Sequence, residues 1–218
     1  DNNALTNYSL QRNYHNHLEL VENKMYVKYN NNSIYSIDIS DLDNIVETEI
    51  ISYTEDGFSI YNFSIEGNKL IYLLHDPTHD FYYKVMTLEI GSEAVHIADI
   101  HAYNASPFLL NDVAYIVGSW GISYAENFNE ATNGCCESEN RLMDSGFEID
   151  SNRKPFIHNS KVYLFGNEPN DGSNFWQVVE ADLNSQSFTW LQPEMYTDLE
   201  SYDLDNLGNL NTYSYTNG

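Results

Sequence analysis

The segment His75-Asp76-Pro77-Thr78-His79-Asp80 carries two imidazoles and two carboxylates within six positions. Neutral imidazole nitrogens and carboxylate oxygens are good ligands for divalent metal ions. The residue types therefore make His75, Asp76, His79 and Asp80 candidate metal ligands. The same stretch also fits a polar turn set by the Asp-Pro step, which needs no metal.

Two further segments offer oxygen ligands of the kind that calcium prefers. Glu168, Asn170 and Asp171 form an acidic stretch, and residues 203–208 partly resemble a calcium-binding loop. In the second segment Leu207 stands at a ligand position, and no glutamate follows at the closing one. Calcium is therefore the one cofactor that the sequence suggests, and otherwise it predicts none.

The two cysteines, Cys135 and Cys136, are adjacent in the chain. They cannot join distant segments, so the fold is not a disulfide scaffold. We expect a disulfide between these neighbours in a secreted protein; the alternative is two free thiols. Their acidic surroundings raise the pKa of a thiol, which argues against a reactive nucleophile.

Aromatic side chains gather near the acidic and amide-rich stretches. Flat rings stack on the apolar faces of sugars, while amides and carboxylates bind hydroxyl groups. This composition predicts a glycan- or peptide-binding surface, although the same rings also suit ordinary packing between sheets. The candidate ligand-binding residues are Trp120, Tyr124, Phe128, Asn170, Asp171 and Trp176.

The charge of the chain excludes several partners. Its 218 residues include 9 Lys+Arg and 33 Asp+Glu, for a formal net charge of −24. Nucleic acids and anionic membranes both require clustered basic residues. Hydrophobic residues make up 42% and aromatic residues 14%, so the chain has the composition of a folded protein. No apolar run approaches the roughly 20 residues of a membrane span. We expect a secreted, periplasmic or cell-surface bacterial protein that does not insert into a membrane.

These candidate residues must be positioned by an internal repeat. A short apolar strand with tyrosine at a fixed place follows an Asn-containing or polar turn five times. The tyrosines are Tyr26, Tyr72, Tyr115, Tyr163 and Tyr213, spaced by 46, 43, 48 and 50 residues. Around each anchor, apolar and polar residues alternate with the period of a half-buried strand. In the first two repeats this predicts strands near residues 24–29, 33–39, 45–50, 63–65, 70–74, 82–90 and 94–100.

Four short antiparallel strands in every 45 or so residues are typical of a propeller blade. The sequence therefore predicts an all-β protein, a five-bladed β-propeller with four-stranded antiparallel blades. We expect one domain over residues 1–218, with the N-terminal segment closing the ring. The blades are expected near residues 17–54, 60–102, 105–152, 155–194 and 196–218 plus 1–14. The alternative is a piece of a larger ring.

The fourth repeat, residues 155–192, resembles a Kelch-type blade. Those blades run strand, Gly-Gly, loop, strand ending in Asp, and a Trp-containing strand. Here Gly166, Asp182 and Trp190 fall at these places, but Asn167 stands where the second glycine belongs. The resemblance covers most of the chain as repeat rhythm and only this repeat in detail, and it implies a propeller.

In a propeller, the loops between strands two and three lie on one face of the ring, where function concentrates on a rigid scaffold. We expect these loops at residues 30–33, 75–82, 118–140 and 166–176. The predicted function is a non-catalytic, extracellular module that binds a glycan or a protein there. One alternative is a carbohydrate-active enzyme, which needs only paired carboxylates. The other is a structural domain of a larger surface protein or toxin. Tyr202-Asp203 is a short segment that resembles the tyrosine–aspartate repeat of large toxins.

Overall fold

The computed structural model describes residues 14–54, 57–78, 82–101, 105–127, 142–151, 153–167 and 176–191. Its regular structure is almost entirely β: seventeen strands and one short 3-10 turn, η1 (Ala125–Asn127). The strands form four antiparallel sheets that follow one another along the chain.

Sheets 1 to 3 are meanders in which consecutive strands pair, and sheet 4 departs from this pattern in its first strand. Sheet 1 contains β1 (Tyr14–Val21), β2 (Lys24–Tyr29), β3 (Ser33–Asp38) and β4 (Val46–Ser52). Sheet 2 contains β5 (Ser59–Glu66), β6 (Lys69–His75), β7 (Tyr82–Glu89) and β8 (Val95–His101). Sheet 3 contains β9 (Ser106–Leu110), β10 (Val113–Gly118), β11 (Gly121–Tyr124) and β12 (Met143–Asp144). Sheet 4 contains β13 (Glu148–Ile149), β14 (Phe156–His158), β15 (Lys161–Asn167), β16 (Trp176–Asp182) and β17 (Ser187–Trp190).

Sheet 4 has an interrupted first strand. β13 pairs with the end of β15 at Gly166 and Asn167, whereas β14 pairs with its beginning, from Lys161 to Tyr163. The two short strands together occupy the place that β1, β5 and β9 fill in the other sheets. Arg153 and Lys154 lie in the segment between β13 and β14 and are not part of either strand.

The turn before the second strand of each sheet explains the polar turn residues of the repeat. Non-glycine residues there adopt positive φ: Glu22 at 53°, Asn111 at 53° and Asn159 at 50°. In sheet 2 the position belongs to Gly67, at 59°. Two-residue hairpin turns of this handedness match the twist of the strands, and asparagine and glycine tolerate it best.

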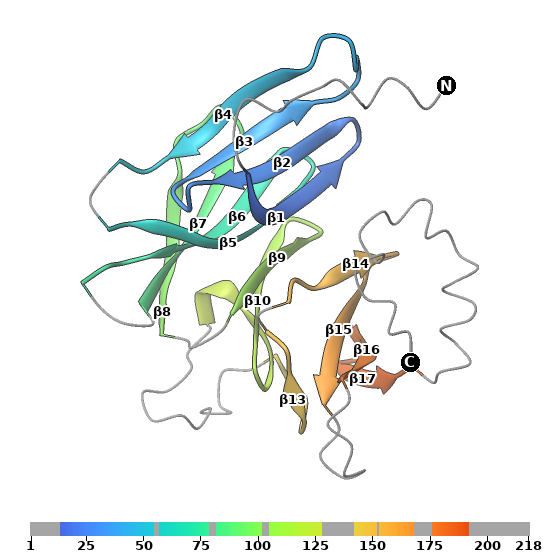
Figure 1. The fold of residues 1–218 in the computed structure, drawn as a ribbon. Helices are drawn as coiled ribbons and strands as arrows, with labels where there is room; N and C mark the ends of the chain where they lie inside the picture. The colour runs from blue at the N-terminus through green and yellow to red at the C-terminus, as the bar shows by residue number, and fades with distance from the viewer. Residues whose placement is uncertain are drawn as a thin grey trace, which may run out of the picture.

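The four sheets pack face to face in chain order, and each interface has its own apolar cluster (Figure 1). Tyr26 and Ile34 of sheet 1 pack with Phe63 and Tyr72 of sheet 2. A second cluster joins sheets 2 and 3, and a third joins sheets 3 and 4. The first strands β1, β5 and β9 also contact one another in sequence. The sheets are thus stacked with their first strands on the same side, the arrangement of propeller blades.

These findings confirm the all-β prediction and the strands expected in the first two repeats, and sheets 1 to 3 are four-stranded and antiparallel as predicted, whereas sheet 4 has five strands. One expectation was wrong in detail. Residues 118–140 are not one loop between strands two and three, because β10 and β11 are joined by a tight turn at Ser119-Trp120. The long segment follows β11 instead, between the third and fourth strands of sheet 3. Across the described ranges, no helix is long and apolar enough to span a membrane.

Candidate functional site

The first strands converge on a buried ion pair. Glu19 of β1 is 8% exposed, and one carboxylate oxygen accepts a hydrogen bond from the Ile65 amide of β5 at 3.1 Å. The other oxygen pairs with the ammonium group of Lys154, from the segment between β13 and β14. This contact joins sheets 1, 2 and 4 on the side of the first strands, which is the axis of a propeller.

Desolvation dominates the electrostatics of this pair. Burial raises the pKa of Glu19, although the Lys154 charge and the Ile65 amide both act to lower it. Burial also lowers the pKa of Lys154, against the opposing effect of Glu19. Burial therefore disfavours each charged form and the partner's charge favours it, so that removal of either partner would leave an unpaired buried charge.

A chain of buried hydrogen bonds also links first strands of different sheets. Asn62 of β5 donates to the Ser106 hydroxyl of β9 at 2.8 Å, and that hydroxyl donates to the Ser151 carbonyl at 2.9 Å. The carboxamide oxygen of Asn62 accepts the Phe63 amide. The groups of this chain therefore satisfy one another across sheets 2, 3 and 4, so the axis side is a polar connection between sheets.

Trp120 lies at the tip of the tight turn between β10 and β11 and is 41% exposed. The turn is fixed through its backbone: the Ser119 carbonyl accepts the Ile149 amide at 2.7 Å, and the Trp120 carbonyl accepts the Ser145 amide at 3.0 Å. Gly118 and Gly121 pair at the base of the turn. The structure thus presents a large aromatic side chain from an anchored two-residue turn.

Tyr124 lies at the other end of β11, so the structure separates it from Trp120. It is 38% exposed and stacks on Tyr115 with ring centroids 5.4 Å apart. Tyr115 in turn stacks on Phe108 at 5.0 Å. Tyr124 is therefore the outer ring of an aromatic stack that continues into the core.

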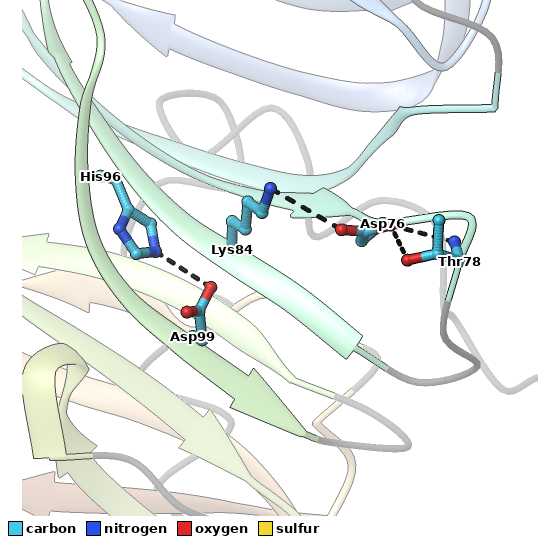
Figure 2. Close-up of polar contacts among 5 residues, drawn as sticks. All are labelled: Asp76, Thr78, Lys84, His96 and Asp99. Atoms are coloured by element: carbon cyan, nitrogen blue, oxygen red, sulfur yellow. Dashed lines mark hydrogen bonds and ion pairs between the residues drawn. The ribbon is translucent and has the colours of Figure 1, made fainter.

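Asp76 is occupied by contacts within its own turn and with Lys84 of β7 (Figure 2). One carboxylate oxygen accepts both the amide and the hydroxyl of Thr78, at 2.9 and 2.6 Å, and the other lies 3.7 Å from the Lys84 ammonium. His75 is the last residue of β6, and its ring packs against Tyr83. In the described part of this segment, the polar-turn interpretation accounts for the contacts of Asp76.

A second polar pair lies on the neighbouring outer strand. His96 of β8 is hydrogen-bonded to Asp99 of the same strand (Figure 2), at 3.0 Å and with both side chains more than 40% exposed. Asp99 stands opposite Lys84 in the register of β7 and β8. Charges of both signs thus alternate along this part of sheet 2. Among the described residues, no group of three or more metal-ligating side chains gathers there or elsewhere.

Several predicted site residues lie outside the described residues. They are His79, Asp80, Phe128, Cys135, Cys136, Glu168, Asn170 and Asp171, as well as residues 203–208. Trp176 begins β16, but its side chain is not among those described. The metal, calcium and disulfide interpretations therefore stay predictions.

The axis residues were not found by sequence reasoning. Leu18-Glu19-Leu20 alternates in the way that normally places the glutamate in water and the leucines inside. The structure reverses this, with Leu18 at 41% and Leu20 at 57% exposure around the buried Glu19. Only the approach of β5 and Lys154 from other sheets makes this face of β1 the inner one.

Comparison with solved structures identifies the architecture. An oligogalacturonate lyase from Vibrio parahaemolyticus superposes with a TM-score of 0.51 at 11% identity, over 78% of this chain and 50% of its own. TolB from Acinetobacter baumannii gives a TM-score of 0.50 at 14% identity, over 78% of this chain and 41% of its own. The fold is that of a β-propeller.

A computationally designed protein, Ika8, also aligns over 78% of this chain and 46% of its own, at 11% identity. Its TM-score of 0.42 is too low to indicate a shared fold. The chain thus spans half or less of the length of these three structures. No model of a known protein family matches it, and no curated protein does. At these identities the likeness concerns the fold alone.

Proposed function

We propose that this propeller is a non-catalytic binding module that recognises a glycan or a protein through the face bearing the β10–β11 turn. Trp120 carries the proposal. It is a large, partly exposed ring on a turn whose two carbonyls are both bonded to the following segment. A turn whose backbone is ordered before binding loses little conformational entropy when a ligand stacks on the ring that it carries.

The charge distribution favours an uncharged or basic ligand. Of the seven Lys and Arg residues that the structure describes, six contact a carboxylate or a backbone carbonyl: Lys28, Lys69, Lys84, Arg153, Lys154 and Lys161. An anionic polysaccharide needs cations that are available to it. Against a net charge of −24, a neutral saccharide or a basic protein surface is the better match.

Finer features of the fold belong to the same proposal. We infer a five-bladed ring with Kelch-like packing in its fourth blade. In that blade Gly166 lies against Phe147 and Trp190, so that a Cβ at position 166 would fall 2.6 Å from Phe147 and 3.0 Å from Trp190. The glycine and the tryptophan on which the Kelch resemblance rests are thus in contact. A secreted, periplasmic or cell-surface location suits the acidic surface.

The carbohydrate-active alternative needs two converging carboxylates, at least one of them with a raised pKa. Glu19 is the one buried carboxylate among the described side chains, and Lys154 and Ile65 occupy it. The structural-domain alternative requires no site at all. No observation favours either alternative in the way that the anchored turn of Trp120 favours a binding module.

An array of neutral and anionic glycans, probed with the full chain, tests the proposal. We expect binding to neutral saccharides, and Trp120→Ala should weaken it roughly 10- to 100-fold, as expected for the loss of an aromatic anchor. Val95→Ala removes a side chain that is 61% exposed on β8, and it serves as a matched control with unchanged binding. If the array is negative, immobilised basic proteins replace the glycans. Equal affinity of the Trp120→Ala variant and the parent chain for every ligand found would refute the proposed face.

A further inference from the structure

Sheet 4 carries a group of three aromatic side chains at its β14–β15 hairpin. Phe156 and His158 are two residues apart on β14, so they point to the same face of the sheet. Tyr163 of β15 stands opposite Phe156 in the register and shares that face. The Phe156 ring contacts both of the others, with centroids 6.2 Å from His158 and 6.0 Å from Tyr163. These three side chains are called the hairpin platform below.

The hairpin platform is accessible to solvent. Phe156 is 36% exposed and His158 is exposed as well, whereas Tyr163 is half-buried. The planes of Phe156 and His158 are within 13° of parallel. The next ring along this face, Phe165, lies under the Arg153 guanidinium at 4.6 Å from the ring centroid. The accessible aromatic surface of this face is therefore centred on Phe156.

Polar contacts hold the two neighbours of Phe156. The Asn159 carboxamide nitrogen lies within hydrogen-bond distance of His158 Nε2, at 3.0 Å. The Tyr163 hydroxyl is hydrogen-bonded to Glu180, which also accepts a hydrogen bond from the Lys161 ammonium at 2.5 Å. These rings are therefore ordered before any ligand arrives, so that stacking on them costs little further side-chain entropy.

The chemistry of this surface matches a neutral saccharide. Flat rings stack on the apolar faces of sugars, and the adjacent Lys161–Glu180 pair offers donors and acceptors to hydroxyl groups. The pair has no net charge, and the chain as a whole carries −24, so an anionic polysaccharide would be repelled. A cationic ligand would meet the ammonium of Lys161, whose side chain is 46% exposed.

The hairpin platform lies away from the Trp120 turn. The β14–β15 turn joins the first and second strands of its sheet, as the β9–β10 turn does in sheet 3. Trp120 belongs to the β10–β11 turn, at the opposite end of β10. The two aromatic surfaces therefore lie at opposite ends of the strands and share no residue.

We propose that Phe156, His158 and Tyr163 form a second saccharide-binding site, in which neutral sugar rings stack on the β14–β15 hairpin. Phe156 supplies the main stacking surface. Lys161 and Glu180 bind the sugar hydroxyls at its side. This site goes beyond the Trp120 face and does not depend on it.

Isothermal titration calorimetry of the full chain carrying Trp120→Ala tests this site, because that variant removes the contribution of the Trp120 face. The neutral probes are cellohexaose, xylohexaose, maltohexaose and chitohexaose. We expect at least one of them to bind, and added Phe156→Ala to weaken that binding roughly 10-fold or more. Phe156→Tyr keeps the ring and should retain the affinity. Val113→Ala, at a position that is 39% exposed at the same end of the strands, is the matched control with unchanged binding.

Circular dichroism establishes that each variant is folded. If Phe156→Ala is unfolded, His158→Ala at its exposed position replaces it in the same comparison. Failure of the Trp120→Ala chain to bind any neutral probe would overturn the second site, and so would equal affinity with and without the Phe156 ring. Tighter binding of hexagalacturonate, an anionic probe, than of every neutral one would overturn the choice of ligand. The Trp120 face is judged by comparing the parent chain with Trp120→Ala, so the two proposals fail separately.

Discussion

Replacement of Lys154 by methionine isolates the energetics of the axis. Methionine keeps an unbranched side chain of similar length, so the loss of packing is small. The change leaves Glu19 buried at 8% exposure, with the Ile65 amide and the Ser64 hydroxyl as hydrogen-bond donors but no countercharge. Breaking a buried ion pair on one side typically costs 3–5 kcal/mol.

The cost has an upper limit, because Glu19 can take up a proton. Protonating a carboxyl of ordinary pKa, about 4.3, at pH 7 requires roughly 2.7 × 1.36, or about 3.7 kcal/mol. We therefore expect Lys154→Met to lower the free energy of unfolding at pH 7 by about 3–4 kcal/mol. This upper limit falls by about 1.4 kcal/mol for each unit by which the pH is lowered. The penalty should therefore be below about 1 kcal/mol at pH 4.5.

The direction in which the Lys154→Met penalty changes with pH follows from the raised pKa of Glu19. A carboxyl whose pKa is raised in the folded state favours folding below its ordinary pKa, and that advantage is lost as the pH rises through the folded-state value. Removing Lys154 raises the pKa of Glu19 further, so the difference between variant and parent must grow with pH.

Urea unfolding at several pH values between 4.5 and 7.5 measures this difference directly. Lys69→Met is the matched control, since its partner Asp112 is 87% exposed and such pairs contribute about 0–1 kcal/mol. A Lys154→Met penalty that does not change with pH, or that is no larger than that of Lys69→Met at pH 7, would refute the account of a buried, costly carboxylate.

Two further substitutions test the packing of the sheets. Gly166→Ala places a methyl group 2.6 Å from the Phe147 ring and should lower the free energy of unfolding in urea by about 1–3 kcal/mol. Gly67→Asn, in a turn with open space, should lower it by less than about 1 kcal/mol. Equal losses in the two variants would contradict the packing of Gly166. Tyr72→Phe removes the hydroxyl contact with Tyr53 at 2.5 Å between sheets 1 and 2 and should cost about 1–2 kcal/mol, and a neutral result would show that water replaces that contact.

Much of the architecture was predictable from the sequence, because local patterns determine it. Alternating polarity defines strands such as β2 and β3, and asparagine and other positive-φ residues define the hairpin turns between first and second strands. A repeat of four such strands has few stable arrangements other than a propeller. The charge of −24 likewise predicts that the chain binds neither nucleic acids nor anionic membranes, and this stays a prediction.

The candidate site depended on the tertiary structure. Alternation shows that a strand has two faces but not which face another sheet will cover. For β1 it suggested buried leucines and an exposed Glu19, and the approach of β5 and Lys154 reversed the two. Periodicity also gave no sign that β11 separates Trp120 from Tyr124, since a four-residue strand in an aromatic stretch is too short to recognise. Sequence determined the strands and their repeat, whereas contacts between residues far apart in the chain decided which side chains are buried, paired or presented to a ligand.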